Sequence, residues 1–107
     1  MNTQRFLGLL GFAMRAGRVS IGTELVLSSL AKHGNAKPGL VLTAADASDG
    51  TKKKIRTKCE FYSVKNIITE FTSDELGERL GKSFAPMCIG ITDDNFAAEI
   101  SAALSED

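Results

Sequence analysis

The stretch Leu40-Val-Leu-Thr-Ala-Ala-Asp-Ala-Ser48 decides the fold of this chain. Its first four residues form a short apolar run, which is typical of a strand buried on both faces of a sheet. Ser48 is a good N-cap for a following helix, because its hydroxyl can accept a hydrogen bond from a free amide of the first turn. A buried strand that leads into a helix indicates an α/β protein with the sheet at its centre.

Short strands and helices alternate on both sides of this stretch. Thr72 and Glu75 form a capping box, and Gly17 and Gly81 each follow a helical pattern as C-terminal stops. The alternation predicts one domain over residues 1–107, a three-layer α/β/α sandwich. In chain order we expect a helix over 6–14 that stops at Gly17, a strand over 18–22, a helix over 25–31 that stops at Gly34, a strand over 40–43, a helix after Ser48, a strand over 64–69, a helix from 72 to 81, a strand over 87–92 and a helix from 93 to 104.

Length and composition exclude several classes of protein. The chain has 107 residues, of which 43% are hydrophobic and 24% charged. A domain of this length buries about 65% of its unfolded surface, so neither disulfides nor a metal are needed to hold it. No apolar run approaches the roughly 18 residues of a membrane span, and the N-terminus does not read as a secretory signal. We therefore expect a cytoplasmic, reduced protein without a membrane partner.

The zero net charge conceals an asymmetry along the chain. Residues 1–65 carry eleven basic and four acidic side chains, whereas residues 66–107 carry two basic and nine acidic ones. A basic surface, if one forms, comes from the first part of the chain, and its partner would be a polyanion. The densest basic run predicts a secondary basic patch on one helix face, made of Lys52, Lys53 and Arg56.

Three patterns that suggest catalysis have simpler structural readings. The segment 77–83 has only three residues between its glycines, one fewer than a phosphate-binding loop, and it follows a helix. Asp46, after a buried strand, is a candidate metal or phosphoacceptor carboxylate, but capping of amides in its turn is the favoured interpretation. Cys59 is expected to be a buried thiol and His33 a cation at a helix end. We therefore expect no enzyme and no metal site.

A pattern spread over nearly the whole chain resembles the L7Ae/L30e family of ribosomal and kink-turn RNA-binding proteins, in particular its bacterial YlxQ-type branch. Each motif is weak alone, but their order and spacing match together. The motifs are Arg15-Ala-Gly-Arg-Val, Gly22-Thr23, Gly34-Asn-Ala-Lys37, Ala45-Asp-Ala-Ser48, Lys58-Cys-Glu-Phe-Tyr62, Leu76-Gly77 with Gly81-Lys82, and Ile91-Thr-Asp-Asp-Asn-Phe-Ala97.

The resemblance implies an α/β/α sandwich with a four-stranded mixed sheet that binds structured RNA without a cofactor. It implies that Gly22 and Thr23 meet the RNA backbone through amides at a helix start. It also implies that Phe84, in the loop 83–86, stacks on an extruded base. Five cations are predicted to converge on one face with Gly22 and Phe84, namely Arg15, Arg18, Lys32, Lys37 and Lys82.

The chain departs from the family pattern at the start of the second helix. Where the family has asparagine, glutamate and lysine, this chain has Glu24, Leu25 and Ser28. The residues at positions 24 and 28 remain candidate RNA contacts, but typical kink-turn recognition is weakened. The sequence favours a small RNA-binding protein associated with the ribosome or with translation. The alternatives are an interaction module that kept the fold without the RNA site and, less favoured, an enzyme or phosphoacceptor that uses Asp46.

Overall fold

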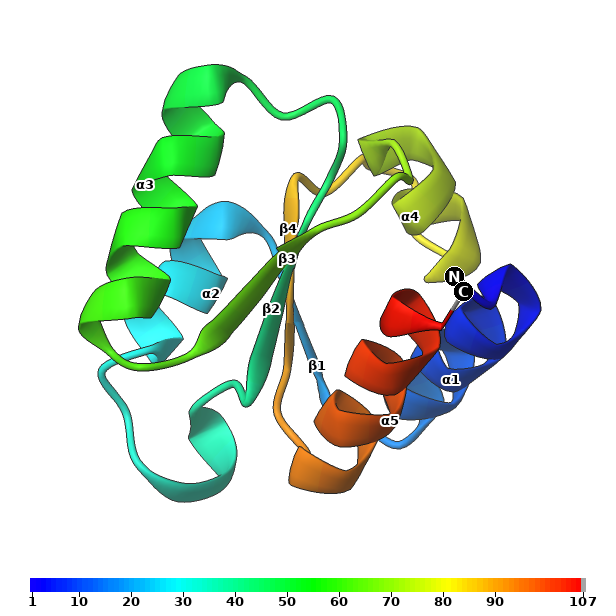
Figure 1. The fold of residues 1–107 in the computed structure, drawn as a ribbon, viewed down its shortest axis with the longest axis horizontal. Coiled ribbons are helices and arrows are strands. Elements are labelled where there is room, and N and C mark those ends of the chain that lie inside the picture. The colour runs from blue at the N-terminus through cyan, green and yellow to red at the C-terminus, as the bar shows by residue number, and fades with distance from the viewer. Residues whose placement is uncertain (107) are drawn as a thin grey trace.

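A four-stranded sheet lies at the centre of the computed structural model, which describes residues 1–106 (Figure 1). The spatial order of the strands is β1-β4-β2-β3. β4 is antiparallel to both of its neighbours and β2 is parallel to β3, so β1, β2 and β3 all run in one direction. The predicted mixed sheet is confirmed, with strands β1 Val19–Ile21, β2 Leu40–Thr43, β3 Lys65–Ile68 and β4 Cys88–Ile91.

Helices cover both faces of this sheet and give the predicted three layers (Figure 1). α1, α4 and α5 pack on one face, and α2 and α3 pack on the other. None of the helices within residues 1–106 is long and apolar enough to cross a membrane. The helices are α1 Thr3–Arg15, α2 Thr23–Ser29, α3 Asp49–Phe61, α4 Ser73–Arg79 and α5 Asp94–Ser105, with a short 3₁₀ helix at Gly34–Ala36.

Alternate residues of the buried strand β2 supply the two halves of the core. Leu40 and Leu42 pack with α1, α4 and α5, whereas Val41 packs with α2 and α3. All three side chains are at most 1% exposed. Burial of one such side chain stabilises a fold by about 1.5–3 kcal/mol. The apolar run that predicted a strand buried on both faces is therefore the run that joins the layers.

The predicted helix starts and stops are confirmed, with one exception. Ser48 Oγ accepts from the Thr51 amide at 3.2 Å, and Thr72 forms the capping box with Glu75. The exception is α2, which ends at Ser29 instead of continuing to Ala31. The hydroxyls of Ser28 and Ser29 both donate to the Leu25 carbonyl, at 3.0 and 2.7 Å. Such bonds compete with the helical backbone, which gives a physical reason for the early end.

The strand directions give the sheet two chemically different ends. We call the end at which β1, β2 and β3 finish the carboxyl end, and the opposite one the amino end. At the carboxyl end the Gly22 amide donates to the Cys88 carbonyl at 2.9 Å. At the amino end the Thr92 amide donates to the Arg18 carbonyl at 2.9 Å. Arg18 and Gly22, which are close in sequence, therefore lie at opposite ends of the sheet.

Gly77 in α4 provides a test of the packing between this helix and the loop before β4. A Cβ atom at Gly77 would overlap the Phe84 carbonyl oxygen and lie 3.2 Å from Pro86 Cδ. We expect Gly77→Ala to lower the free energy of unfolding by about 1–3 kcal/mol, as overpacking does. Gly8→Ala is the matched control, because nothing lies within 4 Å of a Cβ there. The control should gain about 0.5–1 kcal/mol from reduced backbone entropy in the unfolded chain. Urea unfolding measures the free energy of unfolding of both variants. Equal changes in the two variants would contradict the close packing of Gly77 against the Phe84 loop.

Candidate nucleic-acid interface

The turn at Gly22 places the start of α2 beside the loop that precedes β4. Gly22 has φ +101°, a value that side chains disfavour, and its carbonyl accepts from the Val26 amide. Its own amide is occupied by the Cys88 carbonyl. The Gly22 amide is thus not free for an RNA phosphate, and in this respect the expectation from the sequence is wrong. What Gly22 does is hold two loops together at the carboxyl end.

The loop over residues 82–87 is held at this end by α4 and β2. The Lys82 amide donates to the Gly77 carbonyl at 2.9 Å, and the Ala44 amide donates to the Met87 carbonyl at 2.9 Å. The loop therefore has a defined backbone path between the helix and the sheet. Phe84 is 54% exposed in this loop and belongs to neither core cluster. Its side chain is therefore open to solvent, and stacking of this ring on a base remains a prediction.

The residues of α2 that depart from the family pattern are exposed to solvent. Glu24 and Ser28 are exposed, and Leu25 is 50% exposed. Val26 and Leu30 form the buried face of the helix instead. No side chain within residues 1–106 caps the first turn of α2. Leu25 is thus a surface residue and not a core residue, so positions 24, 25 and 28 can be changed without opening the core.

Of the five cations predicted to converge, Lys82 lies in the loop between α4 and β4, which also carries Phe84. Arg18 and Lys37 lie at the amino end, in a hollow of about 330 Å³ that Asp93 and Asp94 also line. Lys37 Nζ donates to the Tyr62 carbonyl at 3.2 Å. The predicted convergence is wrong, because β1 separates Arg18 from Gly22 and carries them to opposite ends of the sheet.

The two remaining cations also lie away from the Gly22 turn. The Arg15 guanidinium stacks on the Phe12 ring of α1, with 4.8 Å between its carbon and the ring centroid. Lys32 is exposed beyond the last turn of α2, whose first turn is at Gly22. The candidate interface is therefore smaller than the predicted one and consists of the Gly22 turn with Thr23, Glu24 and Ser28 of α2, and of Lys82 and Phe84 in the loop before β4.

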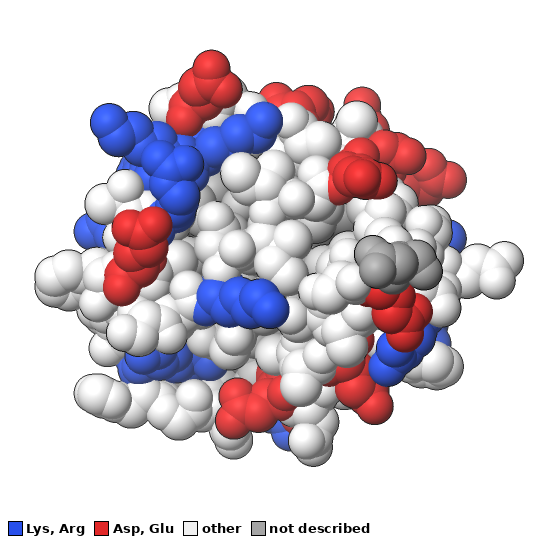
Figure 2. Space-filling model, in the orientation of Figure 1, with Lys and Arg blue, Asp and Glu red and all other residues white. Residues whose placement is uncertain are grey.

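Charge is segregated on the surface seen in Figure 2. Lysine and arginine side chains gather over the first half of α3, whereas aspartate and glutamate gather over α4. In the predicted secondary patch, Lys53 and Arg56 are exposed and Lys52 is half-buried. A polyanion is attracted to the α3 side of the molecule and repelled from the α4 side.

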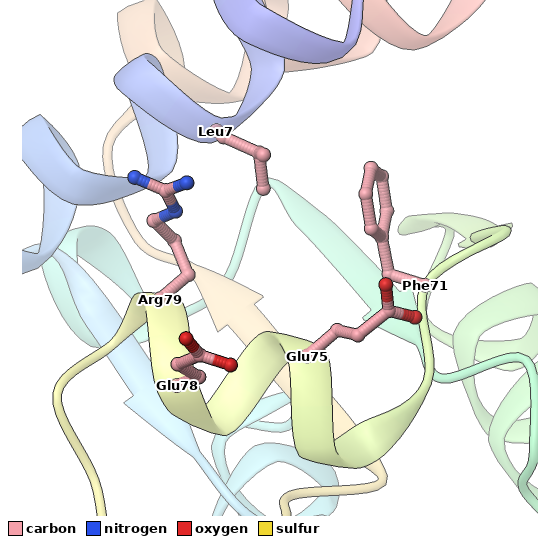
Figure 3. A pocket seen from close by; sticks show the side chains of 5 residues that line it. All are labelled: Leu7, Phe71, Glu75, Glu78 and Arg79. Atoms are coloured by element: carbon pink, nitrogen blue, oxygen red, sulfur yellow. The ribbon is translucent and has the colours of Figure 1, made fainter.

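A hollow of about 360 Å³ between α1 and α4 does not suit RNA (Figure 3). Glu75 and Glu78 line it together with Arg79, and Leu7 and Phe71 form its apolar wall. Glu75 already accepts a hydrogen bond from the Thr72 amide at 2.9 Å. The two carboxylates would repel a phosphate, so this hollow is separate from the interface.

Asp46 joins the loop after β2 to the start of α4. Its two carboxylate oxygens accept from the Ser73 amide and the Ser73 hydroxyl, both at 2.8 Å. The amide hydrogen bond, followed by the hydroxyl, lowers the pKa of Asp46 below its ordinary value of 3.8. The interpretation of Asp46 as a cap is confirmed, but the capped residue is Ser73 and not a neighbour in the turn. Sequence reasoning missed Ser73 because nothing local marks a partner 27 residues away.

The remaining candidates for catalysis are placed apart or made inert. Cys59 lies on the buried face of α3, and desolvation raises its pKa to about 11, so the thiol stays protonated. His33 is exposed at the start of the 3₁₀ helix rather than at the end of α2. In the part of the chain that the structure describes, no group of three histidine, cysteine or acidic residues could hold a metal ion.

Sequence comparisons relate the chain to a known family. The profile of the Ribosomal protein L7Ae/L30e/S12e/Gadd45 family matches residues 4–101. The chain is 36% identical over 104 residues to the RNA-binding protein YlxQ of Bacillus subtilis (strain 168), which covers 97% of the chain and 99% of that protein. It is also 36% identical over 96 residues to the RNA-binding protein YlxQ of Enterococcus faecium, covering 90% of the chain and 87% of the relative.

Solved structures share the fold. A protein of unknown function from Bacillus halodurans C superposes with a TM-score of 0.86 at 31% identity, over 95% of this chain and 98% of that one. The 15.5kD RNA binding protein of Giardia lamblia superposes with a TM-score of 0.75 at 19% identity, over 95% of this chain and 83% of that one. The second likeness supports the fold alone.

Asp46 provides a prediction about pH. A carboxylate with a lowered pKa in the folded state stabilises the fold above the ordinary carboxyl pKa, and this contribution is lost as the pH falls through the folded-state pKa. We expect Asp46→Asn to lower the urea midpoint at pH 7, and the difference from the wild type to shrink below about pH 4. Ser73→Ala serves as the control, since it removes the hydroxyl partner without a change in charge. If the urea midpoints of the wild type and Asp46→Asn differ by the same amount at pH 7 and pH 3, the stabilising role of the Asp46 carboxylate is contradicted.

Proposed function

The chain belongs to the ribosomal protein L7Ae/L30e/S12e/Gadd45 family, and from this premise we propose that it binds structured RNA through the carboxyl end of its sheet. The observation that carries the proposal is the match to an RNA-binding protein over 97% of the chain. Neither the family nor these relatives are named for a catalytic activity, in agreement with the expectation that the chain is not an enzyme.

The geometry of the carboxyl end supplies the groups that RNA binding requires. Lys82 offers an exposed ammonium group for a phosphate, and Thr23 offers a hydroxyl for the backbone. Phe84 offers a half-exposed ring on which an unpaired base can stack. These groups lie on α2 and on the loop before β4, two segments that the hydrogen bond from the Gly22 amide to the Cys88 carbonyl joins. A rigid set of backbone and stacking contacts selects RNA by its shape more than by its sequence.

Recognition of base edges is the weak part of this interface. Glu24 is exposed and would repel a phosphate, and Leu25 cannot accept a hydrogen bond from a base. Ser28 already donates to the Leu25 carbonyl at 3.0 Å. The proposed RNA is therefore a bent or looped element of the translation apparatus, such as one in ribosomal RNA, bound in the cytoplasm with little preference for a standard kink turn.

Two substitutions at the carboxyl end test the location of the interface. We expect Phe84→Ala to weaken binding about fivefold or more, since stacking of one base is worth about 1–3 kcal/mol. Lys82→Ala should weaken binding for all sequences and reduce the salt slope by about one. The matched control is Lys32→Ala, an exposed lysine beyond the other end of α2. Fluorescence anisotropy with a labelled kink-turn RNA at several salt concentrations measures all three, and a larger loss for Lys32→Ala than for Lys82→Ala would refute the location.

Restoring the family residues tests the account of specificity. The triple variant Glu24→Asn, Leu25→Glu, Ser28→Lys places polar groups at three exposed positions. A good bidentate base contact is worth about 1–3 kcal/mol, so we expect about a tenfold gain in preference for a kinked RNA over plain duplex. Calorimetry on both RNAs at one salt concentration gives the two affinities. The account fails if the wild type already prefers the kinked RNA as strongly as the triple variant does.

A further inference from the structure

The outer face of α3 carries a groove that the proposed interface does not use. The groove has a volume of about 570 Å³ and runs along residues at helical spacing, opposite the buried face of Ile55 and Cys59. Its walls are formed by Gly50, Lys53, Lys54, Thr57 and Lys58, with Phe61 and Tyr62 at its end.

Phe61 is exposed at the end of this groove without a structural role that accounts for it. Its side chain is 78% exposed, and it belongs to neither core cluster. Tyr62 packs against the core, and its ring meets the Phe61 ring edge-on, with 4.8 Å between the centroids. The ring of Phe61 is thus supported from one side and open to solvent on the other. Such a ring is a stacking platform for a flat apolar ligand.

The charges on α3 select the class of that ligand. Residues 49–61 carry five basic and two acidic side chains. Within residues 1–106 none of Lys53, Lys54 and Lys58 forms an ion pair, so their ammonium groups are free for an external anion. Lysines along a groove with an aromatic ring at its end are the combination that binds single-stranded nucleic acid, which offers phosphates and unpaired bases together.

We infer that the α3 groove, the surface of Lys53, Lys54, Lys58 and Phe61, binds a single-stranded segment of the same RNA that the carboxyl end binds. The inference rests on the proposed function for the identity of the polymer but uses different residues. α3 begins at the carboxyl end, next to the loop of Asp46, and a helix of 13 residues spans about 20 Å. A strand that leaves the first site can therefore run along α3 and place an unpaired base on Phe61.

The α3 groove contains different residues from the secondary basic patch that was predicted from sequence. Of its three residues only Lys53 lines the groove, together with Lys54 and Lys58. Lys52 is half-buried and contributes to the lowered pKa of Asp46, which places its charge near the carboxyl end. The aromatic end of the groove could not be found from the charge pattern alone.

The test compares two RNAs that differ only in a tail. One is a kink-turn RNA, and the other is the same RNA with an unpaired tail of about six uridines, the footprint of a single short binding site. Fluorescence anisotropy gives the affinity of the wild type, of Phe61→Ala and of Phe12→Ala for both. Phe12 is the matched control, a phenylalanine 57% exposed on α1, on the opposite face of the sheet.

We expect the tail to raise the affinity of the wild type at least fivefold, and Phe61→Ala to remove this gain while leaving the untailed RNA within twofold. Phe12→Ala should keep the gain. A tail that adds no affinity, or a Phe61→Ala variant that keeps the gain, overturns the inference. Failure of the proposed function would give a different result. Either the wild type would not bind the untailed RNA, or the Phe84→Ala variant would bind it as tightly as the wild type does.

Cross-linking gives a second, direct readout with the wild-type protein. A 4-thiouridine in the tail should cross-link to the tryptic peptide of residues 59–65, which contains Phe61 and Tyr62. Cross-links confined to peptides of the α1 and α4 side would overturn the inference even if the tail raised the affinity.

Discussion

The antiparallel pairing of β4 with β1 on one side and β2 on the other is the constraint on which the rest of the structure depends. Ile89 and Ile91 of β4 face the same core as Leu42, and Gly90 lies between them on the other face of the strand. Because three strands run one way and β4 runs the other, the loop before β4 meets the ends of β1 and β2. The loop of Phe84 therefore meets the Gly22 turn, although the sequence separates them by more than half its length.

Two glycines allow the loop of Phe84 and the Gly22 turn to lie close together, because glycine has no side chain. A Cβ at Gly90 would lie 3.1 Å from Pro38 Cγ and 3.5 Å from Val26 Cγ1, so its absence lets α2 lie close to the sheet. Gly77 lets the backbone of the Phe84 loop approach α4 in the same way. The interface is thus set by backbone packing beneath it, while the side chains that face solvent are free to differ from the family pattern.

Sequence patterns predicted the helices and strands of this fold, but not at which end of the sheet each connecting segment lies. Hydrophobic periodicity and caps such as Ser48 are local, and local signals located nearly every helix and strand. The strand predicted over 18–22 already separates Arg18 from Gly22 by about 13 Å, but the partners of a strand are not local, so the sequence did not show at which end of the sheet the other predicted cations would lie. The bond between Asp46 and Ser73 was missed for the same reason.

The distribution of charge about the sheet limits how a polyanion can lie on this protein. α4 begins at the same end as the Gly22 turn, and its acidic side chains, among them Asp74 and Glu75, lie on the face of the sheet opposite to α3. A phosphate backbone held near Lys82 is therefore repelled on the α4 side and attracted on the α3 side. At zero net charge this polarity, rather than overall attraction, would orient a bound polyanion with its phosphates toward the α3 side.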